Sequence, residues 1–238
     1  MTQLPHIALT ASILSLGVAF SGAASALTLN TSGLKANSVL TFSVAGYGSA
    51  SAAGITFRPL GNMTRIADVD VLDPDTGEMI PTPSYNQPVT SADIKIGWNL
   101  KITPTAGNAT RSALQLIRGA RTLTLGNFRV DFVNKVLYGD VFTKNGVQSQ
   151  LAIYNFKDNG DLHISFKGLV LNQTQSVSNL MFTQQLQDII GTELALSSPL
   201  KATLATTEWG TIAVKVTSYK RSPAVSNKPL TASEIPAP

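Results

Sequence analysis

The sequence predicts an all-β, mainly antiparallel protein that folds as a β-sandwich or a partly closed barrel, with one short helix near the C-terminal third. Three observations lead to this prediction: short runs of alternating apolar and polar residues, Gly- and Asn-containing turns between them, and their order as sequential hairpins. A sheet with one apolar face must bury that face, so strands of this kind form two packed layers or a barrel.

The amino terminus has the pattern of a secretory signal peptide. Residues 7–20 form an apolar run, and Ala24-Ser25-Ala26 supplies the small residues of a cleavage site. A helix that crosses a ~30 Å hydrocarbon core needs about 20 apolar residues, so this run is too short for a permanent anchor. We therefore expect export with cleavage after Ala26, and a mature chain that is not an integral membrane protein.

The clearest strand pattern lies between Arg121 and Leu171. Residues 122–133 alternate, with a one-residue change of phase at Gly126-Asn127 that predicts a β-bulge. Short turn signals separate the runs that follow, which predicts a meander of four strands joined by hairpins. The predicted turns are Asn134-Lys135, Asn145-Gly146 and Asp158-Asn159-Gly160-Asp161.

The remaining segments complete a β-rich domain over residues 27–220. Residues 73–89 hold four prolines and are expected to be an extended surface loop or a boundary between two subdomains. Apolar residues at helical spacing predict a helix over residues 178–190 that ends at Gly191. Residues 221–238 are rich in proline and poor in apolar residues, which predicts a disordered tail. Further strands are predicted at residues 38–45, 66–72, 94–102 and 211–217.

Composition limits the chemistry and the compartment. The chain has no cysteine, which excludes disulfides, thiol catalysis and thiolate metal sites. Exported domains without disulfides favour a bacterial source, and hence a periplasmic, cell-surface or extracellular location. The net charge of +4 is too small to identify a partner.

The sequence predicts no catalytic residue and no cofactor. Removal of the leader leaves His163 as the one histidine, and it lies on the polar face of a predicted strand without a Gly-x-Ser-x-Gly motif elsewhere. An oxygen-ligand calcium site at Asp73, Asp75 and Glu78 is a weak candidate, because the spacing departs from that of an EF-hand loop. A solvated turn is the favoured interpretation of these three residues.

A basic stretch between Ile94 and Val130 contains no acidic residue. Such a stretch can attract phosphate, sulfate or carboxylate groups of a surface polymer. Nucleic-acid binding is not expected, because exposed aromatic residues would have to accompany the basic ones and aromatics make up only 7% of the chain. The candidate contacts with an anionic partner are Arg111, Arg118, Arg121 and Arg129.

Aromatic residues offer two further alternatives. Trp98 and Trp209 can each stack on a sugar ring, but core roles are favoured because large aromatics supply much of the buried area of a β core. Tyr138, Tyr154 and His163 are residue types that bind haem iron, although nothing in their spacing requires them to meet.

The leading functional hypothesis is therefore an exported, non-catalytic surface, matrix or adhesion-type protein that binds an anionic surface polymer or another surface protein. The alternative is a periplasmic or extracellular carrier of a small apolar ligand, such as a lipid or haem, held inside the sandwich or barrel. An outer-membrane barrel and an enzyme rank third and fourth. An apolar interior cavity would favour the carrier, and a closed interior would favour the surface role.

Overall fold

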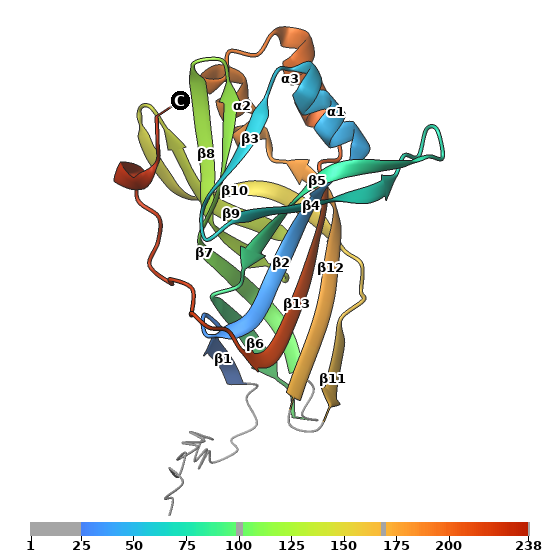
Figure 1. Ribbon diagram of the computed structural model, residues 1–238, viewed down its shortest axis with the longest axis vertical. Coiled ribbons are helices and arrows are strands. Elements are labelled where there is room, and N and C mark those ends of the chain that lie inside the picture. The colour runs from blue at the N-terminus through green and yellow to red at the C-terminus, as the bar shows by residue number, and fades with distance from the viewer. Residues whose placement is uncertain (1–24, 99–101, 168–169, 238) are drawn as a thin grey trace, which may run out of the picture.

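The computed structural model describes residues 25–98, 102–167 and 170–237. Its strands form one antiparallel sheet that curls into a half-barrel, and three short helices lie together at one end (Figure 1). The all-β prediction is confirmed, with the partly closed barrel as the form observed. No helix in the described part of the chain is long and apolar enough to cross a membrane.

The sheet order is β1-β6-β7-β8-β9-β10-β12-β13-β2-β5-β4, with β3 paired to β7 and β11 paired to β12. The strands are β1 Ser25–Asn30, β2 Leu34–Phe42, β3 Thr56–Gly61, β4 Thr64–Leu72, β5 Met79–Pro88, β6 Ser91–Ile96, β7 Ile102–Arg118, β8 Arg121–Asp131, β9 Val136–Thr143, β10 Gly146–Asp158, β11 His163–Lys167, β12 Val170–Phe182 and β13 Gly210–Lys220. The helices are α1 Val44–Ala52, α2 Gln184–Glu193, α3 Ser198–Thr206 and the 3-10 turn η1 Ala232–Glu234.

Most of the predicted leader lies outside the described residues. Strand β1 begins at Ser25 and pairs with β6, with Leu27 opposite Ile94. Cleavage after Ala26 stays a prediction, and it would leave four residues of β1 in place.

The central strands follow the predicted pattern. Leu123 and Leu125 of β8 are buried, and the bulge at Asn127 is confirmed by its φ of +50° and by the register shifts against both neighbouring strands. The turn before β9 is also confirmed. Asp131 stabilises it by accepting hydrogen bonds from the backbone of Val133 and Asn134.

The hairpin between β9 and β10 is confirmed, but its turn lies one residue earlier than predicted. Thr143 pairs with Gly146, so that Lys144 and Asn145 occupy the turn. Gly146 is the first residue of β10 and has a φ of +129°, a conformation that L side chains rarely adopt.

Replacing Gly146 with valine should therefore lower the free energy of unfolding by about 1 kcal/mol or more, because a β-branched side chain is strained at positive φ. Denaturant unfolding measures this change. Gly33→Val is the matched control, because Gly33 also has open space around it but no positive φ. Equal midpoints for the two variants would contradict the assigned turn.

The predicted hairpin at residues 158–161 is wrong. Strands β10 and β11 run end to end along the same side of β12, with Asp158 opposite Val177 and His163 opposite Thr174. The polar residues between them bind the edge of β12 instead of reversing the chain: Asp161 accepts from the Ser176 backbone N–H at 2.8 Å, and Asn159 Nδ2 donates to Ser176 Oγ at 3.0 Å.

The proline-rich segment is a strand rather than a loop. Only residues 73–78 turn the chain, and β5 then pairs with both β4 and β2. Pro81 and Pro83 are tolerated because β2 pairs only with residues 84–88, so the missing N–H groups face no neighbouring strand. Strands β4 and β5 belong to the same sheet and project from its side as a ribbon (Figure 1).

The single strand predicted at residues 94–102 is two strands. Ile96 pairs with Ile102 across the β6–β7 hairpin, and residues 99–101 between them lie outside the described part of the chain. The alternation of apolar and polar residues continues across this reversal, so it does not mark where β6 ends.

The helix prediction is partly wrong. Residues 178–182 belong to β12, and α2 begins only after Thr183, whose side chain caps it by accepting from the Leu186 N–H. Gly191 lies inside α2 rather than after it. Helices α1 and α3 were not predicted, because α1 is built from small residues without an apolar stripe.

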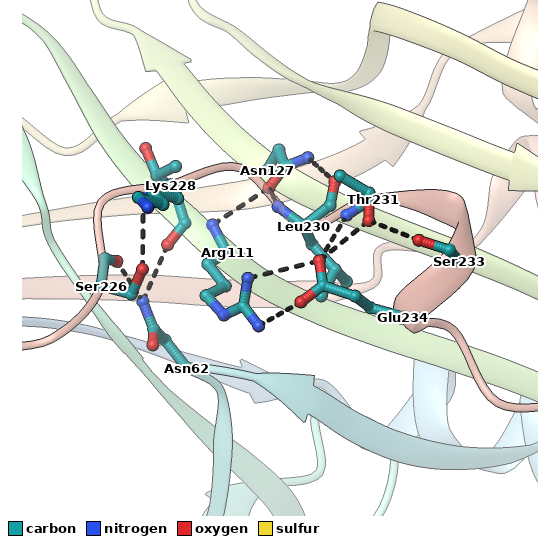
Figure 2. Close-up of polar contacts among 10 residues, drawn as sticks. Asn62, Arg111, Asn127, Ser226, Lys228, Leu230, Thr231, Ser233 and Glu234 are labelled. Carbon is teal, nitrogen blue, oxygen red and sulfur yellow. Dashed lines mark hydrogen bonds and ion pairs between the residues drawn. The ribbon is translucent and has the colours of Figure 1, made fainter.

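The C-terminal segment differs from the expected disorder. It runs from the end of β13 past Asn62 and Asn127 to the ends of β8 and β9 (Figure 1). Asn127 donates from Nδ2 to the carbonyl of Leu230 and accepts from its N–H, and Leu230 is buried (Figure 2). Side chains spread over the sheet thus satisfy the polar backbone of a segment that has few apolar residues of its own.

An ion pair fixes the end of this segment. Arg111 donates to both carboxylate oxygens of Glu234 (Figure 2), and these hydrogen bonds, together with those from the backbone and side chain of Thr231, lower the pKa of Glu234 to about 2. Because the folded-state pKa of Glu234 lies below the ordinary value of 4.5, its ionised carboxylate contributes its full stabilisation above pH 4.5. This stabilisation is lost as the pH falls toward 2.

Candidate functional site: a cleft beside helix α1

A cleft of about 250 Å³ opens between α1, β3 and the β4–β5 ribbon. Three separate elements supply its walls, at the helical end of the half-barrel (Figure 1). The lining residues are Tyr47 and Ser51 from α1, Gly54, Ile55, Thr56 and Phe57 from the following connection and β3, and Arg65, Pro83 and Tyr85 from the ribbon.

Helix α1 is held in place at its first turn. Ser43 Oγ accepts from the Gly46 N–H at 2.8 Å and donates to the Glu208 carbonyl, which ties the start of the helix to the segment before β13. A Cβ at Gly46 would lie 3.0 Å from Trp209 Cα, so a larger residue here would have to displace one of the two backbones by a few tenths of an ångström. The next residue, Tyr47, is left 38% exposed at the mouth of the cleft.

The floor of the cleft continues into the core. The Phe42 ring lies 4.6 Å from the Phe57 ring and 6.1 Å from the Tyr85 ring, measured between centroids. Tyr85 is buried, and this burial raises the pKa of its hydroxyl. Like an ordinary tyrosine, Tyr85 is a neutral phenol at neutral pH and can donate a hydrogen bond.

Arg65 supplies a positive charge. It lies opposite Tyr85 in the β4–β5 register, and its Nη2 donates to Asp68 Oδ1 at 2.8 Å. The Arg65 side chain is 53% exposed, and an ion pair that exposed contributes little to stability. The guanidinium remains available to an acidic group of a ligand.

The cleft combines polar and apolar groups. Hydroxyl groups and one cation surround an apolar floor of Ile55, Phe57 and Pro83, so that polar and apolar atoms share the surface of the cleft about equally. Among the described residues, the lining contains no histidine and no carboxylate that would act as a general base.

The structure brings together only two of the four arginines predicted to bind an anionic partner: Arg118 and Arg121 lie opposite each other at the β7–β8 turn. Arg118 donates to the carbonyls of Ala53, Leu194 and Ala195, and so joins the ends of α1 and α2. Arg111 pairs with Glu234. Arg129 lies 3.9 Å from Asp131, and Arg121 lies at the β7–β8 turn with Nη1 3.5 Å from the Glu193 carbonyl oxygen.

The calcium candidates lie in the turn between β4 and β5. Asp73 accepts from the Asp75 N–H at 3.1 Å and from the Thr76 hydroxyl at 2.9 Å, so its carboxylate stabilises the turn. Across the residues that the structure describes, no three histidine, aspartate or glutamate side chains are grouped to hold a metal ion.

Of the residues weighed as haem ligands, Tyr138 lies opposite Ala152 in the β9–β10 register, and Tyr154 and His163 lie far apart. Tyr154 lies opposite Phe182 and His163 opposite Thr174, which are eight residues or about 26 Å apart along β12. Tyr154 is buried and stacks on Phe182 with centroids 4.7 Å apart, and burial raises the pKa of its hydroxyl. His163 is exposed.

The two tryptophans have different environments. Trp209 is 3% exposed and packs on Phe182, which confirms its predicted core role. Trp98 is 94% exposed beside the β6–β7 reversal, so its predicted core role is wrong. The residue was placed in the middle of a strand that in fact ends at Ile96.

No family model matches the chain, and no curated protein matches it. Among solved structures, the chain is similar to the C-terminal domain of HtaA from Corynebacterium glutamicum, with a TM-score of 0.35 and 9% sequence identity. The alignment covers 78% of this chain and 98% of that domain. No residue role is transferred at this level of similarity.

Proposed function

We propose that the protein is an exported, non-catalytic binding protein that holds a flat, largely apolar ligand with an acidic group in the cleft beside α1. The observation that carries this proposal is the pairing of Tyr47 and Arg65, from two different elements, around an apolar floor. The signal-peptide pattern supports export to the periplasm, the cell surface or the medium.

The composition of the cleft defines the ligand class. Phe57 and Pro83 offer apolar surface to a flat ring system, and Arg65 offers a partner for a carboxylate. Ligand pockets commonly measure about 300–1,000 Å³, so this cleft would enclose one edge of a larger molecule and leave the rest in solvent. Ferric haem belongs to this class, and a tyrosine oxygen is an established ligand of haem iron.

Titration with ferric haem tests the proposal. We expect a saturable change in Soret absorbance at one haem per chain, and Tyr47→Phe should weaken binding by about ten-fold or more because the hydroxyl is lost while the ring is kept. Tyr219→Phe is the matched control, since Tyr219 is also exposed but lies on β13. Equal affinity in wild type and Tyr47→Phe would contradict the proposal.

Recognition of the ligand's acidic group is tested by comparing haem with its dimethyl ester. Wild type should bind haem more tightly than its dimethyl ester, in which the carboxylates are blocked. Arg65→Gln should remove that preference while leaving binding of the ester unchanged. A preference retained in Arg65→Gln would show that another residue recognises the acid.

A further inference from the structure

A second, separate space lies inside the half-barrel. The concave face forms a partly open cavity of about 60 Å³ between β12 and β13 on one side and β7 and β8 on the other. None of its lining residues lines the cleft beside α1. An inference about this cavity is therefore independent of the proposed function.

The cavity is almost wholly apolar. Ala106 and Phe128 from one wall and Val177 from the other are buried there, and Val130 and Val214 complete the surface. Ala106 contributes a small side chain to this lining.

A few polar side chains interrupt this surface, and Gln175 is among the most buried of them. Gln175 is 5% exposed, and alternation along β12 places it on the same inward face as Val177. Its Oε1 has no hydrogen-bond partner among the described residues. A buried amide oxygen without a donor is unfavourable, so the position suits a site where a ligand brings the donor.

We infer that the interior of the half-barrel is a binding site for an alkyl chain that carries a hydroxyl group, with the hydroxyl donating to Gln175 Oε1. The enclosed volume is less than half of the about 150 Å³ that accommodates benzene in an engineered apolar cavity. Only the hydroxyl end and the first carbons are enclosed, and the remainder of the chain lies in the open part of the concave face.

Two probes of equal size test the hydrogen bond. Octan-1-ol and 1-methoxyheptane have the same number of heavy atoms, but only the alcohol is a donor. Titration of the full chain, followed by amide chemical shifts on β12 and β13, should show octan-1-ol binding at least ten-fold more tightly. Equal affinities, or no shift with either probe, would overturn the inference.

Variants on the same wall separate this role from a structural one. Gln175→Met should abolish the preference for the alcohol and raise the unfolding midpoint of the ligand-free protein, because an unpaired amide is removed. Gln173→Met, at a half-buried position on the same face, should keep the preference. Ala106→Leu should block both probes. A lower midpoint for Gln175→Met, or an unchanged preference, would contradict the inference.

Discussion

Replacing Gly61 with alanine should lower the free energy of unfolding by more than about 4 kcal/mol or prevent folding altogether. Gly61 ends β3 with a φ of +65°, and a Cβ there would lie 1.8 Å from the carbonyl oxygen of Arg111. That oxygen also accepts the Asn62 N–H at 2.9 Å, and Arg111 is itself held at a φ of +66°. Neither backbone can move aside without breaking the β3–β7 register.

Gly77→Ala separates the clash from the backbone strain. Gly77 has a similar φ of +74°, but a Cβ there would have no atom within 4 Å, so this variant bears only the left-handed strain of about 1–2 kcal/mol. Urea unfolding compares the two proteins. Similar losses of stability would contradict the close approach of β3 to β7.

The second large effect is expected at Asn127, where alanine should cost about 3 kcal/mol or more. The buried side chain accepts from the N–H groups of Arg111 and Leu230 and donates to the Leu230 carbonyl (Figure 2). It also donates to Asp140. Truncation leaves these groups without their partner. Alanine also tolerates the φ of +50° less well than asparagine does.

The same substitution should release the C-terminal segment. Amide hydrogen exchange at Leu230 is expected to accelerate strongly, together with a lower urea midpoint. Asn62→Ala is the control, because Asn62 Nδ2 donates to the Ser226 carbonyl at 2.7 Å but its contacts with the segment are exposed (Figure 2). It should loosen the segment near Ser226 with a much smaller loss of stability. If the amide of Leu230 exchanged at the same rate in Asn127→Ala as in the wild type, this role of Asn127 would be contradicted.

Local patterns predicted the strands whose partners are adjacent in sequence. Alternation and turn residues identified β8, β9 and β10, and the phase change identified the bulge at Asn127. Strand β5 was not predictable in this way, because Pro81 and Pro83 are acceptable only where β2 has already ended. The ordered C-terminal segment was not predictable from local patterns either, because its partners Asn127 and Arg111 lie more than 100 residues away in the sequence.

The cleft depends on the same long-range pairing. Tyr47 lies in a helix of small residues that has no apolar periodicity, and Arg65 comes near it only because β4 and β5 fold back as a ribbon. The Ser43 cap followed by Gly46 was the one local signal for α1. Positive charge was the one signal that indicated the four arginines as contacts for an anionic partner. The carbonyl acceptors of Arg118, at residues 53, 194 and 195, could not be assigned without the fold.

The most direct test of the binding role is an amide NMR spectrum of the full chain with ferric haem added at equal concentration. The paramagnetic iron broadens the signals of nearby residues. The proposal predicts selective loss of signals from residues 44–57, from Arg65 and from residues 83–85, with the signals of β12 and β13 retained. Broadening centred on His163 or Trp98, or spread evenly over the protein, would contradict a ligand site in the cleft beside α1.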